Sequence, residues 1–171
     1  MTFCVYASAS DHIDNKYIHL VEKLGEQLAT DGHSLIFGGG NTGLMGAIAR
    51  GFYSGNGHVI GVIPRFITAI EPTFVDCTTI IYTDDMSKRK EILEKECDAF
   101  LVLPGGIGTF DEFFEILTLK QLGRHSKDIC IININGYFDK LFELIDYCIQ
   151  NGFADAQIKN LFHVLDYSTE Q

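Results

Sequence analysis

The amino-acid sequence predicts an α/β fold in which a mostly parallel sheet is flanked by helices, giving three layers. Strand-like segments alternate with segments of helical periodicity along the 171 residues, which is the pattern of a parallel sheet covered on both faces. Two glycine-rich turns, at 38–43 and 105–108, each follow a predicted strand directly. Ligands of such sheets bind beyond the carboxyl ends of the strands, so we expect both turns at the ligand-binding edge.

The first half of the chain contains three predicted strands and two predicted helices. In order, they are a strand at 3–7, a helix at 15–30, a strand at 34–37, a helix from the first glycine turn to about residue 53, and a strand at 58–63. The helix at 15–30 has apolar residues from Tyr17 to Leu28 at helical spacing, which predicts one buried face. The next helix consists largely of small residues, and Pro64 ends the third strand.

The second half continues the alternation after residues 65–77, which have no clear period and predict a loop or short helix near the ligand end of the sheet. Next come a β-branched strand at 78–83, a helix capped by Asp84 or Asp85 and running to about Cys97, a strand at 99–103, a helix to about Leu122, a final strand at 129–133 and an amphipathic helix at 136–150. The weakly patterned tail fits one short helix. With no linker or repeat, residues 1–171 are expected to form one domain.

The second glycine turn has the pattern of a phosphate-binding segment. Gly105, Gly106 and Gly108 lie between a strand and a helix, where backbone N–H groups can face an anion. Thr109 is a candidate N-cap, and Glu112 lies in the capping-box position three residues later. From spacing alone, Glu112 is either a helix-start carboxylate or a carboxylate held beside a nucleotide sugar.

Two further motifs each have a structural and a functional interpretation. The run Lys88–Lys90 is either a solvated helix face or, because it lies near a helix start at the ligand edge, a phosphate-recognition element. Gly38, Gly40 and Gly43 fit G-x-G-x-x-G, but they follow the second strand, and no acidic residue occurs about 20 residues later to bind a ribose. A tight strand-to-helix turn or a mononucleotide contact is favoured over a dinucleotide site.

Composition excludes several classes of function. The net charge of -10 argues against non-specific binding to nucleic acid or to anionic membranes. No apolar segment is long enough for a membrane span, no signal peptide is visible, and the histidines lack metal-ligand spacing. Five scattered cysteines fit reduced thiols in a cytoplasmic protein. Phe110, Phe113 and Phe114 are interpreted as core or subunit-interface residues.

Taken together, five segments resemble the Lonely Guy family in the right order over nearly the whole chain. They are GGGNTGLMG (38–46), DMSKRK (85–90), PGGIGTFDE (104–112), QLGRH (121–125) and NINGYFDKL (133–141). The family consists of cytokinin riboside 5'-monophosphate phosphoribohydrolases, long labelled "possible lysine decarboxylase". Its specific pattern P-G-G-x-G-T-x-x-E is matched in full by residues 104–112.

The resemblance implies a Rossmann-like homodimer that cleaves the N-glycosidic bond of nucleoside 5'-monophosphates of adenine or N6-modified adenine. The products are the free base and ribose 5-phosphate, and no cofactor or metal is implied. The family's catalytic glutamate falls on Glu112 and its catalytic arginine, in M-H-x-R-K, on Arg89, for which we expect a role in orienting the substrate or Glu115. The substrate-binding residues implied are Gly39, Gly40, Met86, Lys90, Pro104, Gly105, Gly106, Ile107, Gly108, Thr109 and Glu115.

The chain departs from the family pattern at Ser87, where the family usually has histidine, at Leu119, where tryptophan is common, and at 7–10, which reads ASAS instead of containing Gly-Ser-Ser. These positions bear on base preference and ligand contacts.

Two other functions compete with the one that the resemblance implies. Pyridoxal-dependent lysine decarboxylation needs a lysine in a recognisable cofactor context, and none is visible. A non-catalytic nucleotide-binding module is the alternative, against which the presence of both Glu112 and Arg89 favours an enzyme.

Overall fold

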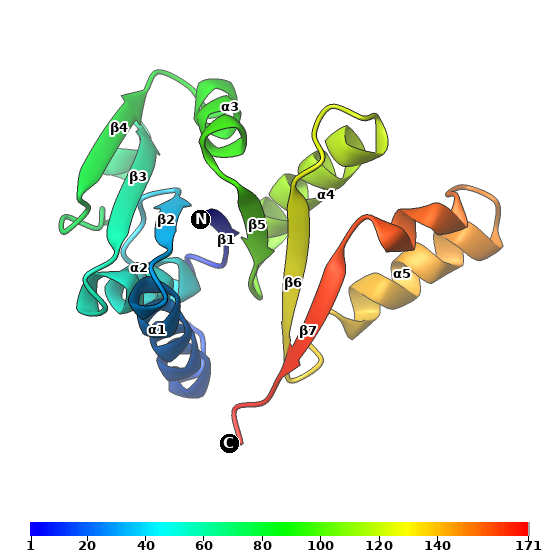
Figure 1. Ribbon diagram of the computed structural model, residues 1–171, viewed down its shortest axis with the longest axis horizontal. Coiled ribbons are helices and arrows are strands. Elements are labelled where there is room, and N and C mark those ends of the chain that lie inside the picture. Colours follow the sequence, from blue (N-terminus) through cyan, green and yellow to red (C-terminus); the bar gives the residue numbers. More distant parts are fainter. Residues whose placement is uncertain (171) are drawn as a thin grey trace.

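Seven parallel strands form one sheet in the order β4-β3-β2-β1-β5-β6-β7 (Figure 1). The structure is a computed structural model and describes residues 1–170. The strands are β1 Thr2–Tyr6, β2 Ser34–Phe37, β3 His58–Pro64, β4 Thr79–Thr83, β5 Ala99–Val102, β6 Asp128–Ile134 and β7 His163–Tyr167. The helices are α1 Asn15–Thr30, α2 Gly43–Ser54, α3 Met86–Glu96, α4 Ile107–Gln121 and α5 Asp139–Gln150, with short 3-10 helices η1 Ile67–Ala69 and η2 Ala156–Asn160.

Helices cover the two faces of this sheet unequally. Apolar residues of α1 and α2 form one core cluster with one face of the sheet, and residues of α3, α4 and α5 form the other cluster with the opposite face. The strand order reverses between β1 and β5, so that the segments after these neighbouring strands diverge at the carboxyl edge. This is the position where doubly wound sheets bind ligands. The predicted three-layer Rossmann-like α/β fold is confirmed.

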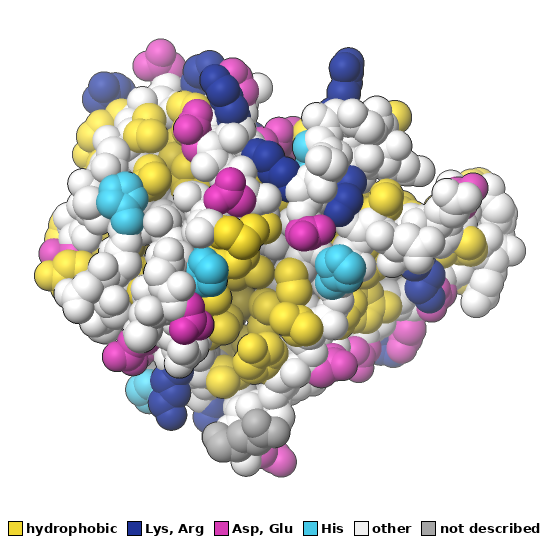
Figure 2. All heavy atoms as spheres, in the orientation of Figure 1, with side chains coloured by type: hydrophobic (Ala, Val, Ile, Leu, Met, Phe, Trp, Pro, Cys, Tyr) yellow, Lys and Arg dark blue, Asp and Glu magenta, His cyan; other side chains and the backbone are white. Residues whose placement is uncertain are grey.

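On the face of the sheet that α1 and α2 cover, the part formed by β7 is exposed. In the sheet register Leu165 pairs with Ile132 and Tyr167 with Ile134, whose side chains belong to the α1–α2 cluster. Leu165 and Tyr167 therefore point to that face, and they are 49% and 38% exposed. Figure 2 shows hydrophobic side chains gathered in the middle of this view, between the positions of α1 and β7.

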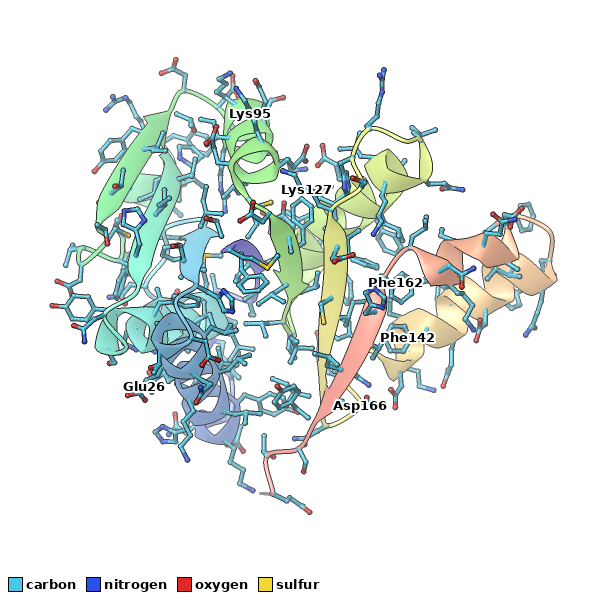
Figure 3. All side chains as sticks on the ribbon, in the orientation of Figure 1. Glu26, Lys95, Lys127, Phe142, Phe162 and Asp166 are labelled. Carbon is cyan, nitrogen blue, oxygen red and sulfur yellow. The ribbon has the colours of Figure 1, made fainter. Side chains whose placement is uncertain are left out.

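The opposite face is closed by side chains that tie the helices to the sheet. Phe142 of α5 stacks on Phe162, which precedes β7, with ring centroids 6.1 Å apart (Figure 3). Lys127, which immediately precedes β6, donates to the backbone carbonyls of Glu94 and Lys95 at the end of α3. The Lys127 contacts hold this end of α3, whose other end contributes to the candidate site. Within residues 1–170, no helix combines the length and the apolar character that crossing a membrane requires.

Most of the predicted elements are confirmed, but the strand at 129–133 is not the final one. The tail contains the expected short helix, η2, and then the unpredicted strand β7. All five residues of β7 are exposed, because it forms the edge of the sheet. An exposed edge strand lacks the apolar pattern that identifies a buried one, so its pairing with β6 depends on tertiary contacts. Helix α5 also starts later than predicted, because Asn135 and Gly136, with φ of 52° and 72°, form a turn.

The predicted capping box at Thr109 and Glu112 is wrong. Helix α4 begins at Ile107 with Gly106 as N-cap, and both Thr109 and Glu112 lie inside the helix. Thr109 is buried against Gly105, where a Cβ atom would lie 2.0 Å from the Thr109 Oγ1. The Thr109 side chain therefore lies against the turn that precedes the helix and does not cap it. Glu112 is left free of any capping role.

Candidate functional site

A cavity of about 320 Å³ lies at the carboxyl edge of the sheet. Five segments that are distant in the sequence surround it: the segment after β1, the turn after β2 with the start of α2, the loop after β3, the first turns of α3 and the first turns of α4. The lining residues are Ala7, Ser8, Ala9, Gly38, Met45, Ile67, Glu71, Met86, Arg89, Lys90, Gly106, Gly108, Thr109, Asp111 and Glu112.

Arg89 and Glu112 face each other in this cavity from α3 and α4. The Arg89 Nη2 lies 3.8 Å from the Glu112 Oε1, and the two side chains are only 10% and 11% exposed. The Nη1 lies 3.6 Å from the Met86 sulfur, and the Nε is buried with no hydrogen-bond partner among the described residues. A buried donor without a partner is unusual in a folded protein and calls for an explanation, and a guanidinium that lines a cavity can bind a ligand oxygen there.

Helix α3 places Arg89 because its start is firmly capped. Asp85 is the N-cap, and its carboxylate accepts a hydrogen bond of 2.7 Å from the backbone N–H of Lys88. This confirms one of the two predicted caps. Arg89 follows within the first turn, so its side chain leaves the helix at the ligand edge of the sheet.

Burial raises the pKa of Glu112 from 4.5 to about 7, although the positive charges of Arg89 and Lys90 act in the opposite direction. Desolvation of the carboxylate outweighs the attraction of the two cations. Ionised and protonated forms therefore coexist near neutral pH. Carboxyl groups with such a pKa, in a cavity and beside a charged partner, are typical of functional sites.

This raised pKa predicts a pH-dependent cost in stability. Between about pH 4.5 and pH 7 the folded state binds more protons at Glu112 than the unfolded state, so the free energy of unfolding falls as pH rises through this window. Glu112→Gln removes that loss. The free energy of unfolding of the variant minus that of the wild type should therefore be larger at pH 8 than at pH 4, by up to about 3 kcal/mol. Urea denaturation at both pH values measures this gain.

The control for this measurement is Glu143→Gln on α5, since Glu143 is mostly exposed and pairs with Lys140. This variant measures the background effect of a Glu→Gln change at the surface. If the Glu112→Gln difference were equal at pH 4 and pH 8, the carboxyl group would have an ordinary pKa in the folded protein.

Lys90 holds two other carboxylates at the rim of the cavity. Its Nζ lies 2.6 Å from the Asp111 Oδ2 and 2.5 Å from the Glu115 Oε2. Partial burial lowers the pKa of Lys90, but the hydrogen bonds to Asp111 and Glu115 raise it above its usual value overall. Glu115 is therefore bound by Lys90, and the carboxylate next to Arg89 is Glu112. The expectation that Arg89 could orient Glu115 is corrected accordingly.

The start of α4 supplies the candidate anion site. Among the described residues, no side chain caps this helix, so the backbone N–H groups of its first turn are available. A Cβ atom added at Gly106 or Gly108 would meet no other atom within 4 Å, which leaves open space beside these amides. The Tyr137 hydroxyl donates to the Gly105 carbonyl at 2.6 Å and fixes the preceding turn. This arrangement can bind a phosphate group.

The first glycine turn has a different use from the one that its pattern suggests. A Cβ atom at Gly38 would lie 1.9 Å from the Arg89 Nη2, so the guanidinium occupies the space above Gly38. A Cβ at Gly39, which has φ of +79°, would lie 2.2 Å from the Ile63 side chain, and one at Gly43 would lie 2.5 Å from the Ser8 carbonyl. These glycines allow close packing and leave no room there for a pyrophosphate.

The structure brings most of the predicted site residues together, but not all of them. Arg89, Glu112, Met86, Lys90, Gly106, Gly108 and Thr109 line the cavity. Pro104 and Gly105 line a neighbouring cavity, described below. Four predicted residues lie outside both linings: Gly39, Gly40, Ile107 and Glu115. Of these, Ile107 is 85% exposed.

Sequence reasoning missed the residues that close the cavity on the side of η1. Glu71 and Ile67 come from the segment after β3, and Met45 comes from α2. That segment is held over the first glycine turn by backbone hydrogen bonds from Asn41 to Pro72 and from Phe74 to Gly39, each 2.9 Å long. The one sequence feature that could have indicated Glu71 is its position in residues 65–77, a segment without periodicity that was expected near the ligand-binding edge of the sheet.

The five cysteines are free thiols, of which Cys4 and Cys97 are buried and the other three half-buried. Over residues 1–170, no group of three or more histidine, cysteine, aspartate or glutamate side chains is arranged to hold a metal ion. The cavity is lined by a guanidinium, an ammonium group, three carboxyl groups and glycine backbone.

Comparison with known sequences identifies close relatives. Residues 45–171 match the family described as "Possible lysine decarboxylase". The chain is 34% identical over 158 residues to cytokinin riboside 5'-monophosphate phosphoribohydrolase LOG2 of Arabidopsis thaliana, covering 92% of this chain and 74% of the relative. It is 35% identical over 169 residues to the probable enzyme LOG4 of Oryza sativa subsp. japonica, covering 99% of this chain and 74% of the relative.

Comparison with solved structures confirms the fold. The molybdenum cofactor carrier protein of Chlamydomonas reinhardtii superposes with a TM-score of 0.69 at 22% identity, covering 95% of this chain and 88% of that one. The molybdenum cofactor binding protein of Rippkaea orientalis superposes with a TM-score of 0.71 at 20% identity, covering 99% and 90%. At these identities the likeness concerns the fold alone.

Proposed function

The chain belongs to the Lonely Guy family, also described as the possible lysine decarboxylase family, and from this premise we propose that it is a nucleoside 5'-monophosphate phosphoribohydrolase. The substrate class is a 5'-monophosphate of adenosine or of an N6-modified adenosine. The reaction hydrolyses the N-glycosidic bond and gives the free base and ribose 5-phosphate. The observation that carries the proposal is the buried pair of Arg89 and Glu112 beside the open start of α4.

The geometry supports a mechanism based on electrostatics. Cleavage of an N-glycosidic bond builds positive charge on the ribose, which a nearby carboxylate stabilises. Glu112 provides that carboxylate and orients the attacking water. Arg89 lowers the pKa of Glu112 against the effect of burial, so that part of Glu112 is ionised at neutral pH. Its guanidinium, which lines the cavity, is the cationic group next to the substrate. The amides of the first turn of α4, together with Thr109, hold the 5'-phosphate and thereby place the ribose next to Glu112.

Incubation of the protein with AMP tests the proposal directly. We expect free adenine and ribose 5-phosphate, which chromatography detects. A non-catalytic nucleotide-binding module would give a complex of AMP with the protein and no free base, and that result would overturn the proposal. A parallel incubation with an N6-prenylated AMP ranks the two bases by kcat/KM.

Lysine decarboxylation finds little support in the cavity. Lys90 is the lysine that lines it, and its ammonium group is held by Asp111 and Glu115 with a raised pKa. A lysine that forms a Schiff base with pyridoxal phosphate must instead present a neutral amine. The family's descriptive name therefore does not decide the reaction.

A substitution in the first glycine turn tests the position of Arg89 without removing it. The Cβ of Gly38→Ala would collide with the guanidinium, so Arg89 must change its position relative to Glu112. We expect AMP hydrolysis to fall by up to about 100-fold, because small displacements of catalytic groups have effects of this size. Steady-state kinetics measures the loss. In combination with Arg89→Met, Gly38→Ala should cause no further loss, since both act through one side chain; additive losses would contradict this.

The proposal includes the homodimer and the cytoplasmic location that the family resemblance implies. The aromatic residues of α4 contribute less to an interface than expected, since Phe113 is fully buried and Phe110 packs against Phe138 in the chain's own core. Phe114 is 39% exposed and is therefore the aromatic residue of α4 that can contact a second subunit. Sedimentation velocity distinguishes a dimer from a monomer, and a monomer at micromolar concentration would remove this part of the proposal.

A further inference from the structure

A second cavity, of about 400 Å³, lies beside the proposed catalytic cavity at the same edge of the sheet. Ser8 and Gly106 line both cavities and so form the border between them. The border is a fixed part of the fold, because the Ser8 N–H donates to the Pro104 carbonyl at 3.1 Å and joins the segment after β1 to the turn after β5. The two cavities are therefore held in one relative position.

The open start of α4 lies on this border. Gly106 is the N-cap of the helix, and the space beside its Cα is free. A phosphate bound to the first amides of α4 thus has the catalytic cavity on one side and the second cavity on the other. A monophosphate ester fills the first side only. A phosphate that carries a second substituent can extend into the other side.

The walls of the second cavity suit a ring system. Tyr17 and Ile13 come from the start of α1 and the segment before it, Leu44 from α2, and Tyr137 from the turn after β6. The hydrogen bond from Tyr137 to the Gly105 carbonyl holds its ring beside the glycine turn. Of the described residues that line this cavity, Asp14 is the one with a charged side chain. The lining favours a flat group that is neutral or cationic and disfavours a further terminal phosphate.

We propose that the two cavities form one site for a nucleoside 5'-phosphate extended through its phosphate by a second ring-bearing group, that is, for a dinucleotide. The adenosine half occupies the cavity with Arg89 and Glu112, the pyrophosphate crosses the border at Ser8 and Gly106, and the second ring lies between Tyr17 and Tyr137. This inference rests on the proposed function for the placement of the adenosine half. It does not use the G-x-G-x-x-G turn, because Arg89 fills the space above Gly38.

Titration calorimetry with NAD⁺ and AMP tests the inference, using Glu112→Gln protein to prevent turnover. NAD⁺ combines an adenosine 5'-phosphate with a cationic ring on the far side of a pyrophosphate. We expect NAD⁺ to compete with AMP and to bind about tenfold more tightly, since stacking of one ring on aromatic side chains has an effect of this order. Adding Tyr17→Ala should abolish this advantage and leave the affinity for AMP unchanged. Tyr147→Ala, at an exposed tyrosine of α5, is the matched control and should change neither affinity.

The outcomes separate this inference from the proposed function. If wild-type protein hydrolyses AMP but NAD⁺ fails to compete, or keeps its advantage in Tyr17→Ala, the second cavity is no ligand site and the proposed function stands. If NAD⁺ binding depends on Tyr17 but no adenine is released from AMP, the extended site stands and the phosphoribohydrolase activity is refuted. Should Tyr17→Ala fail to fold, Tyr17→Leu removes the aromatic ring but keeps an apolar side chain at this position, and the same loss of the NAD⁺ advantage is expected.

Discussion

Replacement of Glu112 by glutamine is expected to lower the rate of AMP hydrolysis on the order of 100- to 1000-fold while the protein stays folded. Glutamine keeps the size of glutamate, but it has no negative charge and replaces one acceptor oxygen with an NH2 donor. The loss therefore measures how much the carboxylate stabilises the positive charge that forms on the ribose. Because Glu112 lies inside α4 and caps nothing, its replacement leaves the start of the helix unchanged. Kinetics under saturating AMP gives the change in kcat.

Two controls keep this expectation specific. Glu143→Gln makes the same chemical change at a mostly exposed position of α5, away from both cavities, and should retain full turnover. Calorimetry should show that Glu112→Gln still binds AMP, since the phosphate amides and Arg89 remain. If the variant hydrolysed AMP at the wild-type rate, Glu112 would have no part in the chemistry. If it lost AMP binding altogether, its role would be in binding and not in the transition state.

The order of the elements could be predicted from the sequence because most of them bury an apolar face. Helix α1 has the predicted bounds, Asn15–Thr30, since its apolar residues recur at helical spacing and Asp14 caps it. Strand β7 could not be predicted, because it is exposed along its whole length and is defined by its pairing with β6. Local pattern identifies elements that bury one face, and it fails where only hydrogen bonds to a neighbouring strand define the element.

The candidate site was predictable to the extent that it depends on contiguous motifs. Arg89 and Glu112 lie in short specific segments, and the topology places both at the carboxyl edge between β1 and β5. Two features depend on packing between distant segments instead. Gly38 leaves space for the Arg89 guanidinium, and Glu71 reaches the cavity on a loop that is hydrogen-bonded to the first glycine turn. No local periodicity encodes such contacts. The helix start at Gly106 in place of Thr109 is a local difference, in which the threonine side chain lies against Gly105.

Replacement of Arg89 by methionine is the second substitution with a large expected effect, and it should change the pH profile as well as the rate. Methionine has a similar length and no charge. The positive charge of Arg89 lowers the pKa of Glu112 against the larger effect of burial, so its loss moves that pKa above about 7. At pH 7 most Glu112 is then protonated and cannot stabilise the ribose cation. The loss of the guanidinium next to the substrate adds to this effect of protonation, and we expect AMP hydrolysis at pH 7 to fall on the order of 100- to 1000-fold in total.

The sign of the pH effect distinguishes this explanation from a loss of structure. In the wild type, activity should rise with pH as Glu112 ionises, with a midpoint near 7. In Arg89→Met the midpoint should move to higher pH, so that part of the lost activity returns at pH 9. Arg89→Lys keeps a positive charge and should retain the wild-type midpoint at a reduced rate, because an ammonium group cannot reproduce the donor geometry of the guanidinium. Arg124→Met, at an exposed arginine beyond the end of α4, is the matched control. An unchanged midpoint in Arg89→Met would show that the guanidinium acts on the substrate alone, without tuning the ionisation of Glu112.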